Sequence, residues 1–101
     1  MQPTDRLRKL NTTDCLWVYV LRILKDGPTH AYTIRATIEQ RYGFRPGTMT
    51  AYKVLYLLEK DGFVKKTVQG RKRVYSLTEK GKGELQRARS FYKDLVKRLA
   101  S

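Results

Sequence analysis

The stretch FVKKTVQGRKRVYSL, residues 63–77, decides the fold of this chain. It consists of two short runs rich in β-branched and aromatic residues on either side of Gly70, which is the pattern of a β-hairpin. Gln69-Gly70 is not the Asn-Gly or Asp-Gly pair that a two-residue type I′ turn prefers, so we expect a loop of three or four residues with Gly70 at a positive φ. Five of the nine residues from Lys65 to Arg73 are Lys or Arg, and none is acidic. The hairpin is therefore expected to present a basic tip to a negatively charged partner.

Hydrophobic spacing predicts three helices before the hairpin, over residues 12–25, 30–42 and 46–61. Threonines stand before the first two helices as candidate N-caps, with Thr29 before the second, and Pro46 suits the first turn of the third. A glycine follows each helix, as is common at helix C-termini. The residues expected in the core are Leu16, Val20, Leu21, Leu24, Ala31, Ile34, Ile38, Tyr42, Ala51, Leu55 and Leu58.

A fourth helix is predicted after the hairpin, from Glu79 to about Leu99, with Thr78 as its N-cap. Gly81 and Gly83 weaken its start because glycine has low helix propensity. An apolar seam with alternating spacings of three and four residues follows, which is the heptad pattern of a helix that packs along another helix. The seam consists of Leu85, Ala88, Tyr92, Leu95 and Leu99.

The chain has 101 residues, which favours a single domain, and a net charge of +13 with a pI of about 10.2. A charge this one-sided favours a polyanionic partner, namely DNA, RNA or an anionic membrane surface. No stretch is apolar for long enough to span a bilayer, and the N-terminus lacks the apolar region of a secretory signal, so we expect a cytoplasmic protein. Residues 1–11 are polar and basic and are expected to form a flexible arm.

Residues that could perform catalysis or bind a metal are scarce. The chain has one cysteine, Cys15, and one histidine, His30. We expect Cys15 to be a small buried apolar group, with an intermolecular disulfide or a redox role as the alternative. His30 is expected to form a structural hydrogen bond. The sequence also lacks a glycine-rich phosphate loop, a nucleophile elbow and a metal-ligand cluster, so we expect neither an enzyme nor a cofactor.

The order helix, helix, helix, two-stranded hairpin is that of a winged helix, in which a helix-turn-helix is followed by a β-hairpin wing. The second helix of a helix-turn-helix lies in the major groove of DNA, with its N-terminal residues at the base edges. Here that recognition helix is the one opened by Pro46. The alternative is that its threonines are ordinary cap residues and its tyrosine belongs to the core. The candidate DNA contacts are Arg45, Thr48, Thr50, Tyr52 and Lys53.

The wing is expected to contact the phosphate backbone, and one of its arginines could enter the minor groove. A basic face that only meets water is the alternative, but it is less consistent with charge of one sign on a tight hairpin. The N-terminal arm would add further phosphate contacts. The candidates are Lys66, Gln69, Gly70, Arg71, Lys72 and Arg73 in the wing, and Arg6, Arg8 and Lys9 in the arm.

Three blocks of sequence stand out: LKDGPTHAY at 24–32, YKVLYLLEKDGFV at 52–64 and VYSLTEKG at 74–81. Together they make residues 16–78 resemble the winged-helix domain of PadR-like transcriptional regulators. The last block is similar to the Tyr-x-Leu-Thr-x-x-Gly motif of that family. The family usually has glycine where Ala31 stands.

The resemblance implies a homodimer in which the tail helix packs on its partner, and the heptad seam is consistent with this. The single tail helix resembles the short members of the family. We expect the tail to pack with the N-terminal helix of the other subunit, and the alternative is a tail folded back on its own domain. The interface candidates are Trp17, Tyr19, Leu85, Ala88, Phe91, Tyr92, Leu95 and Leu99.

The sequence therefore predicts a mainly α fold with a small β-hairpin. The arm would span residues 1–11, the winged helix 12–78 and the dimerisation helix 79–101. The expected function is sequence-specific binding of double-stranded DNA as a homodimeric regulator, most simply a repressor near the nucleoid. The alternatives are an architectural DNA-binding protein without sequence preference, a protein-interaction module of a transcription assembly, and binding of the tail to an anionic membrane. An effector ligand, if there is one, is not indicated.

Overall fold

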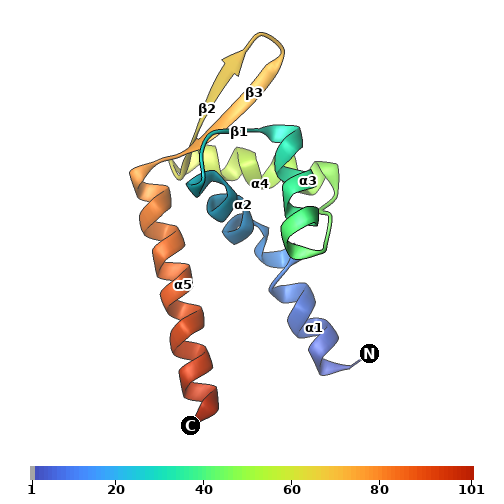
Figure 1. The fold of residues 1–101 in the computed structure, drawn as a ribbon, viewed down its shortest axis with the longest axis vertical. Helices are drawn as coiled ribbons and strands as arrows, with labels where there is room; N and C mark the ends of the chain where they lie inside the picture. Colours follow the sequence, from blue (N-terminus) through green and yellow to red (C-terminus); the bar gives the residue numbers. More distant parts are fainter. Residues whose placement is uncertain (1) are drawn as a thin grey trace.

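The chain folds into a winged helix-turn-helix followed by a long tail helix, and the computed structural model describes residues 2–101 (Figure 1). The fold is mostly helical with a β-hairpin wing, as the sequence predicts. The antiparallel sheet has the strand order β1-β3-β2, so it contains one strand more than the predicted hairpin. No helix within the described residues is long and apolar enough to cross a membrane. The elements are α1 (Pro3–Leu10), the 3₁₀ turn η1 (Thr13–Cys15), α2 (Leu16–Lys25), β1 (Thr29–His30), α3 (Ala31–Tyr42), α4 (Thr48–Lys60), β2 (Val64–Gln69), β3 (Lys72–Leu77) and α5 (Glu79–Ala100).

Helix α2 lies at the centre of the core, since α3, α4, α5 and β3 all pack against it. The predicted core residues are buried with one exception, Tyr42, which is 40% exposed and meets the ring of Tyr19 edge-on at 4.8 Å. Ile23, Val64 and Tyr75 are further core residues that the helical pattern did not indicate. The apolar faces of four helices and one sheet face thus form a single small core.

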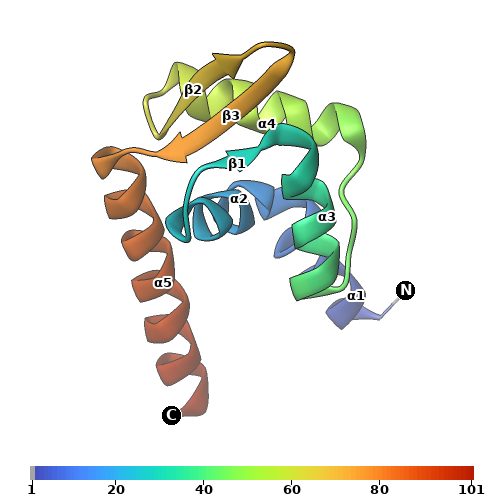
Figure 2. The same cartoon turned by 45° about the horizontal axis from the view of Figure 1, so that its top comes forward.

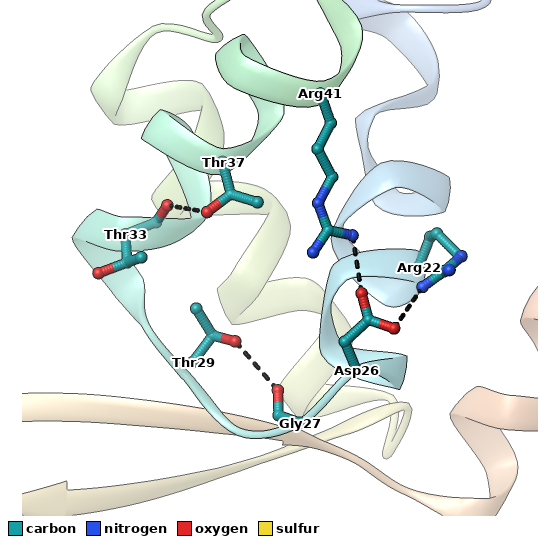
Figure 3. Close-up of polar contacts among 7 residues, drawn as sticks. All are labelled: Arg22, Asp26, Gly27, Thr29, Thr33, Thr37 and Arg41. Carbon is teal, nitrogen blue, oxygen red and sulfur yellow. Dashed lines mark hydrogen bonds and ion pairs between the residues drawn. The ribbon is translucent and has the colours of Figure 1, made fainter.

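The prediction that Thr29 caps α3 is wrong, because Thr29 belongs to strand β1. Thr29 pairs with Tyr75 and His30 with Val74, so β1 is the third strand of the sheet. The hydroxyl of Thr29 donates to the carbonyl oxygen of Gly27 at 3.0 Å and does not accept from the helix (Figure 3). A strand of two residues has no sequence signature of its own, because it exists only where β3 offers an edge to pair with.

The hairpin loop is also tighter than expected. Gln69 pairs with Lys72, which leaves only Gly70 and Arg71 in the turn, so the prediction of three or four loop residues is wrong. Gly70 has φ +61°, as expected, whereas Arg71 does not have a positive φ. This combination is that of a type II′ turn, which requires glycine only at its first central position.

The N-terminal residues form helix α1 where an irregular flexible arm was expected. The Asp5 carboxylate accepts from the backbone N–H of Gln2 at 2.9 Å, and Pro3 occupies the first turn, so the start of the helix is well capped. The hydroxyl of Thr12 donates to the carbonyl oxygen of Arg8 at 2.7 Å. Thr12 therefore closes α1 and does not cap α2. No residue of α1 is buried.

The end of α2 is tied to the end of α3 by a carboxylate between two guanidinium groups (Figure 3). Asp26 forms ion pairs with Arg22 at 2.9 Å and with Arg41 at 2.8 Å. Hydrogen bonds from these two arginines lower the pKa of the Asp26 carboxyl. The pair of contacts fixes α3 against α2 and so holds the first helix of the helix-turn-helix in place.

The tail helix α5 begins as predicted. The hydroxyl of Thr78 accepts from the backbone N–H of Gly81 at 3.0 Å, which is an N-cap, and donates to the carbonyl oxygen of Gly62 at 2.7 Å. Gly81 is buried, and a Cβ there would lie 2.1 Å from the carbonyl oxygen of Phe63. The first turn of α5 is thus packed directly on the turn that follows α4.

Candidate nucleic-acid interface

Helix α4 starts later than predicted, because Pro46 and Gly47 precede it and Gly47 is the N-cap. Pro46 is buried, and its carbonyl oxygen accepts from Nε of Arg35 at 2.9 Å, which joins α3 to the start of α4. Thr48 and Thr50 are exposed in the first turn, and no side chain caps this helix. The cap alternative for the two threonines is therefore wrong, and both residues are exposed.

The exposed face of α4 is broader than the sequence indicated. Tyr52 is 37% exposed and Lys53 is exposed, so Tyr52 does not belong to the core. Met49 is 87% exposed and Tyr56 is 60% exposed, and both lie on the same side at helical spacing. Sequence reasoning missed these two because they look like core residues. Met49 lies four residues before Lys53 and Tyr56 lies three residues after it, so helical periodicity places both on the same face as Lys53.

Arg45 lies just before α4 and is exposed, as predicted, but it is not unpaired. Its guanidinium lies 3.4 Å from the carboxylate of Glu39 on α3. Both side chains are about half exposed, so the pair contributes little to stability and can exchange for another anion.

The wing tip consists of exposed residues, namely Gln69, Gly70, Arg71, Lys72 and Arg73. Strand register places Arg73 on the same sheet face as Tyr75, which is buried, while Lys72 lies on the opposite face. Strand β2 packs against α4, so the wing lies beside this helix (Figure 2). The wing therefore presents positive charge both beside α4 and away from it.

A hollow of about 250 Å³ joins the recognition helix to the wing. It is lined by Tyr52 from α4, by three consecutive cations of the wing tip, and by residues at the start of α3. Tyr32 is 66% exposed there and stacks with His30 at a ring distance of 6.2 Å. Sequence reasoning had not indicated Tyr32. The residues of this interface hollow are His30, Ala31, Tyr32, Tyr52, Arg71, Lys72 and Arg73.

His30 was expected to form a structural hydrogen bond, and this is wrong for one of its nitrogens. Nδ1 is buried and finds no hydrogen-bond partner within residues 2–101. The ring instead packs beside Tyr32 at the edge of the interface hollow.

Lys66 differs from the other wing cations because it is bound internally. Its ammonium lies 3.7 Å from the carboxylate of Glu59 on α4, and both side chains are one-third exposed. The carboxylate is also one cause of the raised pKa of Tyr75, after burial of that phenol. The pair holds the wing against the recognition helix, so Lys66 positions the wing and is less available to a phosphate.

The predicted phosphate contacts of the N-terminal arm lie apart from α4 and the wing. Arg6, Arg8 and Lys9 are exposed on α1, which lies at the end of the molecule opposite the wing (Figure 1). A phosphate bound by the wing of the same chain is thus remote from them.

The predicted dimer contacts divide into two groups. Leu85 is 3% exposed and Ala88 is 9% exposed, so the structure assigns them to the core of one subunit and corrects their prediction as interface residues. Tyr19 packs on the rings of Tyr42 and Phe44, and its hydroxyl donates to the carbonyl oxygen of Asn11. Leu85, Ala88 and Tyr19 thus make their contacts within one subunit.

The other group faces outward. Phe91 is 63% exposed, Leu95 40% and Leu99 77%. Tyr92 is half-buried, and its hydroxyl donates to Sγ of Cys15 at 3.8 Å. Cys15 is only partly buried, so the prediction of a fully buried apolar group is wrong. Burial first, and this hydrogen bond second, raise the pKa of Tyr92 to about 12. The partly buried Trp17 packs against the edge of the core.

A transcriptional regulator from Clostridium thermocellum is similar in structure with a TM-score of 0.78 and 19% identity, over 99% of this chain and 95% of that one. A PadR family transcription regulator from hypervirulent Clostridium difficile has a TM-score of 0.71 and 20% identity, over 84% and 97%. F93 from STIV, a winged-helix DNA-binding protein, has a TM-score of 0.73 and 19% identity, over 84% and 94%.

One sequence relative is an uncharacterized 37.1 kDa protein in transposon TN4556 of Streptomyces fradiae. It is 42% identical over 69 residues, which are 67% of this chain but only 20% of that protein. Residues 20–87 match the Transcriptional regulator PadR-like family, which is a family of regulators and not of enzymes. Because this match spans well over half of the chain, the protein belongs to the PadR-like family of winged-helix, DNA-binding transcriptional regulators.

Proposed function

We propose that the protein is a homodimeric repressor that binds a two-fold-related site in double-stranded DNA. The observation that carries this proposal is the interface hollow, where Tyr52 of the recognition helix and the cations Arg71, Lys72 and Arg73 of the wing line one concave surface. A duplex that places its major groove on α4 brings a phosphate strand to the wing. Such a repressor would act at the nucleoid in the cytoplasm.

Base recognition is assigned to the exposed face of α4. Thr48 and Thr50 offer hydroxyl groups in the first turn, where a recognition helix meets base edges. Lys53 suits the acceptor atoms of guanine, and the exposed thioether of Met49 suits the methyl group of thymine. Tyr56 lies one turn further along the same face.

Phosphate binding is assigned to the wing tip and to the start of α3. Arg71 and Arg73 supply charge without an ion pair in residues 2–101, in contrast to Lys66. Tyr32 is placed to donate a hydrogen bond from its hydroxyl. Contacts of this kind neutralise phosphates and release counterions, so affinity should fall steeply as salt rises.

Dimerisation is assigned to the outer half of α5 and to α1. Phe91, Leu95 and Leu99 expose apolar surface on α5, and Leu7 and Leu10 expose it on α1 at the same end of the molecule. Apolar surface gathered at one end favours burial against a second copy. A two-fold dimer would then place two copies of α4 about one turn of DNA apart, roughly 34 Å.

The test is selection of bound duplexes from a random library, followed by affinity measurements on the recovered site and on a random duplex. We expect two inverted half-sites with centres about one helical turn apart. Lys53→Ala should weaken the recovered site selectively, by about 1–3 kcal/mol if it contacts a base. Recovery of no common sequence would contradict the proposal and favour an architectural DNA-binding protein.

The wing is tested separately by Arg71→Ala and Arg73→Ala. Each should weaken both duplexes alike and reduce the slope of log affinity against log salt by about one. Arg89→Ala is the matched control, because Arg89 is exposed on the inner half of α5, away from the wing, and its loss should leave the slope unchanged. A selective loss on the recovered site would instead assign base contacts to the wing.

A further inference from the structure

The outward face of α4 is a single row of side chains. Met49, Lys53, Tyr56 and Lys60 follow one another at spacings of four, three and four residues, so they lie along one line of the helix. All of them are exposed, and they lie opposite the buried side of α4. We call these residues the outer row. They are the part of α4 that meets base edges when the helix lies in a major groove.

The outer row is poor in groups that read bases through paired hydrogen bonds. Asparagine and glutamine make such pairs with adenine, arginine and lysine make them with guanine, and aspartate and glutamate accept from cytosine. Lys53 and Lys60 are the only members of these classes among the exposed residues of α4. Glu59 is partly buried, and its carboxylate lies 3.7 Å from the ammonium of Lys66. Most base contacts available to this face are therefore apolar or made by single hydroxyl groups.

Met49 is the most exposed large apolar side chain within residues 2–101, at 87%. It stands at the second position of α4, after the N-cap Gly47. Gly47 adds no side chain between the helix start and a base, and a Cβ built there would meet only the Thr50 hydroxyl, at 3.9 Å. The hydrogen bond from Arg35 to the carbonyl oxygen of Pro46 holds the start of the helix in place. The thioether is thus presented at a fixed position with open space around it.

A thioether matches one feature of base edges in the major groove, which is the C5-methyl group of thymine. Methionine is unbranched and polarisable, so it adapts to apolar contacts of irregular shape. Burial of one methyl group against it removes apolar surface from water, which corresponds to about a fourfold gain in affinity. The other distinguishing groups in this groove are hydrogen-bond donors and acceptors, and a thioether is only a weak acceptor.

We propose that Met49 reads the C5-methyl group of one pyrimidine in each half-site and that this contact sets the base preference there. The recognised feature is the methyl group and not the base, so 5-methylcytosine can take the place of thymine. Affinity for a site with cytosine at this position would then rise when that cytosine is methylated. The proposal deepens the proposed function and rests on it, because Met49 meets the methyl group only if α4 lies in the major groove.

The direct test replaces single thymines by uracil in the duplex recovered by selection. Uracil keeps the hydrogen-bonding groups of thymine and lacks only the C5-methyl group. We expect one replacement per half-site to weaken binding about fourfold and the others to have little effect. At the sensitive position, a 5-methylcytosine–guanine pair should bind about fourfold more tightly than a cytosine–guanine pair. Fluorescence anisotropy at fixed salt concentration measures these affinities.

Variants of Met49 show whether this residue makes the contact. Met49→Ala should bind thymine and uracil duplexes alike, whereas Met49→Leu keeps an apolar side chain of similar volume and should retain most of the preference. Leu57→Ala is the matched control, because Leu57 is also exposed on α4, at 43%, but lies outside the outer row. It should leave the ratio of the two affinities unchanged. Circular dichroism checks that the variants are folded.

Two results of these measurements would overturn the proposal. If no single uracil weakens binding, the C5-methyl group is not read. If the loss caused by uracil persists undiminished in Met49→Ala, another residue or the shape of the duplex is responsible for it.

A second comparison separates this proposal from the proposed function. The selection is repeated with a library in which uracil replaces every thymine, and the affinities of both whole libraries are measured. A common site that is bound equally well with uracil would support specific binding and contradict methyl reading. No common site, together with weaker binding of the uracil library that depends on Met49, would contradict the specific repressor and support methyl reading. No common site and equal binding of the two libraries would contradict both.

Discussion

The two halves of α5 share one apolar seam but lie in opposite environments. In the first half Leu85 is 3% exposed and Ala88 is 9% exposed, whereas Phe91 and Leu99 in the second half are 63% and 77% exposed. The first half contributes to the core of its own subunit. The second half projects beyond that core, away from the wing (Figure 1).

The difference follows from the lengths of the two helices that pack together. Helix α2 has 10 residues and α5 has 22, so at 1.5 Å per residue α2 is only about half as long. The seam continues after its partner within the subunit has ended. A heptad pattern therefore identifies an apolar stripe, but it does not identify the surface that covers each part of the stripe.

The largest effect is expected from truncation in the inner half. Leu85→Ala should reduce the free energy of unfolding by about 2–5 kcal/mol, because it leaves a cavity among buried side chains. Leu99→Ala makes the same chemical change in the outer half and should alter subunit stability by no more than about 0.5 kcal/mol. Urea denaturation at low protein concentration measures both. Equal losses of unfolding free energy in the two variants would show that the two halves of α5 contribute alike to the core.

A steric change at the start of α5 should rank second. Gly81→Ala would place a methyl group 2.1 Å from the carbonyl oxygen of Phe63, and such overpacking costs about 1–3 kcal/mol. Gly83→Ala is the matched control, because its Cβ would meet only the Arg87 side chain at 3.7 Å. Helix propensity then predicts a gain of up to about 1 kcal/mol. Thermal unfolding of the two variants should shift in opposite directions.

A charge in the outer half should affect association and not folding. Leu95→Glu should dissociate the proposed dimer while changing the stability of the subunit by about 0.5 kcal/mol or less. Sedimentation velocity gives the oligomeric state, and Gln86→Glu, on the exposed side of the inner half, is the control. A Leu95→Glu protein that sediments like the wild type would exclude the outer half from the interface.

The smallest effect concerns the boundary between the halves, at Tyr92. Because the pKa of Tyr92 is raised from 10.0 to about 12 in the folded state, its contribution to stability is complete below pH 10 and is lost as the pH rises toward 12. Tyr92→Phe should therefore flatten the decline of stability over this alkaline range. Tyrosinate absorbance identifies the group, and Cys15→Ala should lower its titration point. A wild-type Tyr92 that titrates near pH 10 would contradict the buried hydrogen bond.

Much of the fold could be predicted because local signals agree with the tertiary structure. The helical stripes through Leu21, Ile38 and Leu55 mark buried faces, and Thr78 caps the tail helix. The wing could be predicted because two runs of β-branched and aromatic residues stand on either side of Gly70. By contrast, β1 and α1 were missed, since β1 forms only by pairing with β3 and the capping of α1 uses Asp5 in a polar segment.

The candidate interface was predicted less completely. Tyr52, Lys53 and the wing tip were found, but Met49, Tyr56 and Tyr32 were not, because their apolar character suggested burial. Lys66 was grouped with the free wing cations, although Glu59 binds it. Nothing in the charge pattern along the chain indicates which cation an acid from another element will neutralise.

The sequence by itself determined the element order, the core faces of the helices, the basic wing and the family, because these depend on local periodicity, turn residues and short motifs. The tertiary structure alone decided which part of the α5 seam is core, which wing cations are unpaired, and that an apolar pocket lies between α2, α4 and α5. Those features depend on which surfaces meet, and residues such as Trp17, Asp61 and Glu84 are far apart along the chain before folding brings them to one pocket.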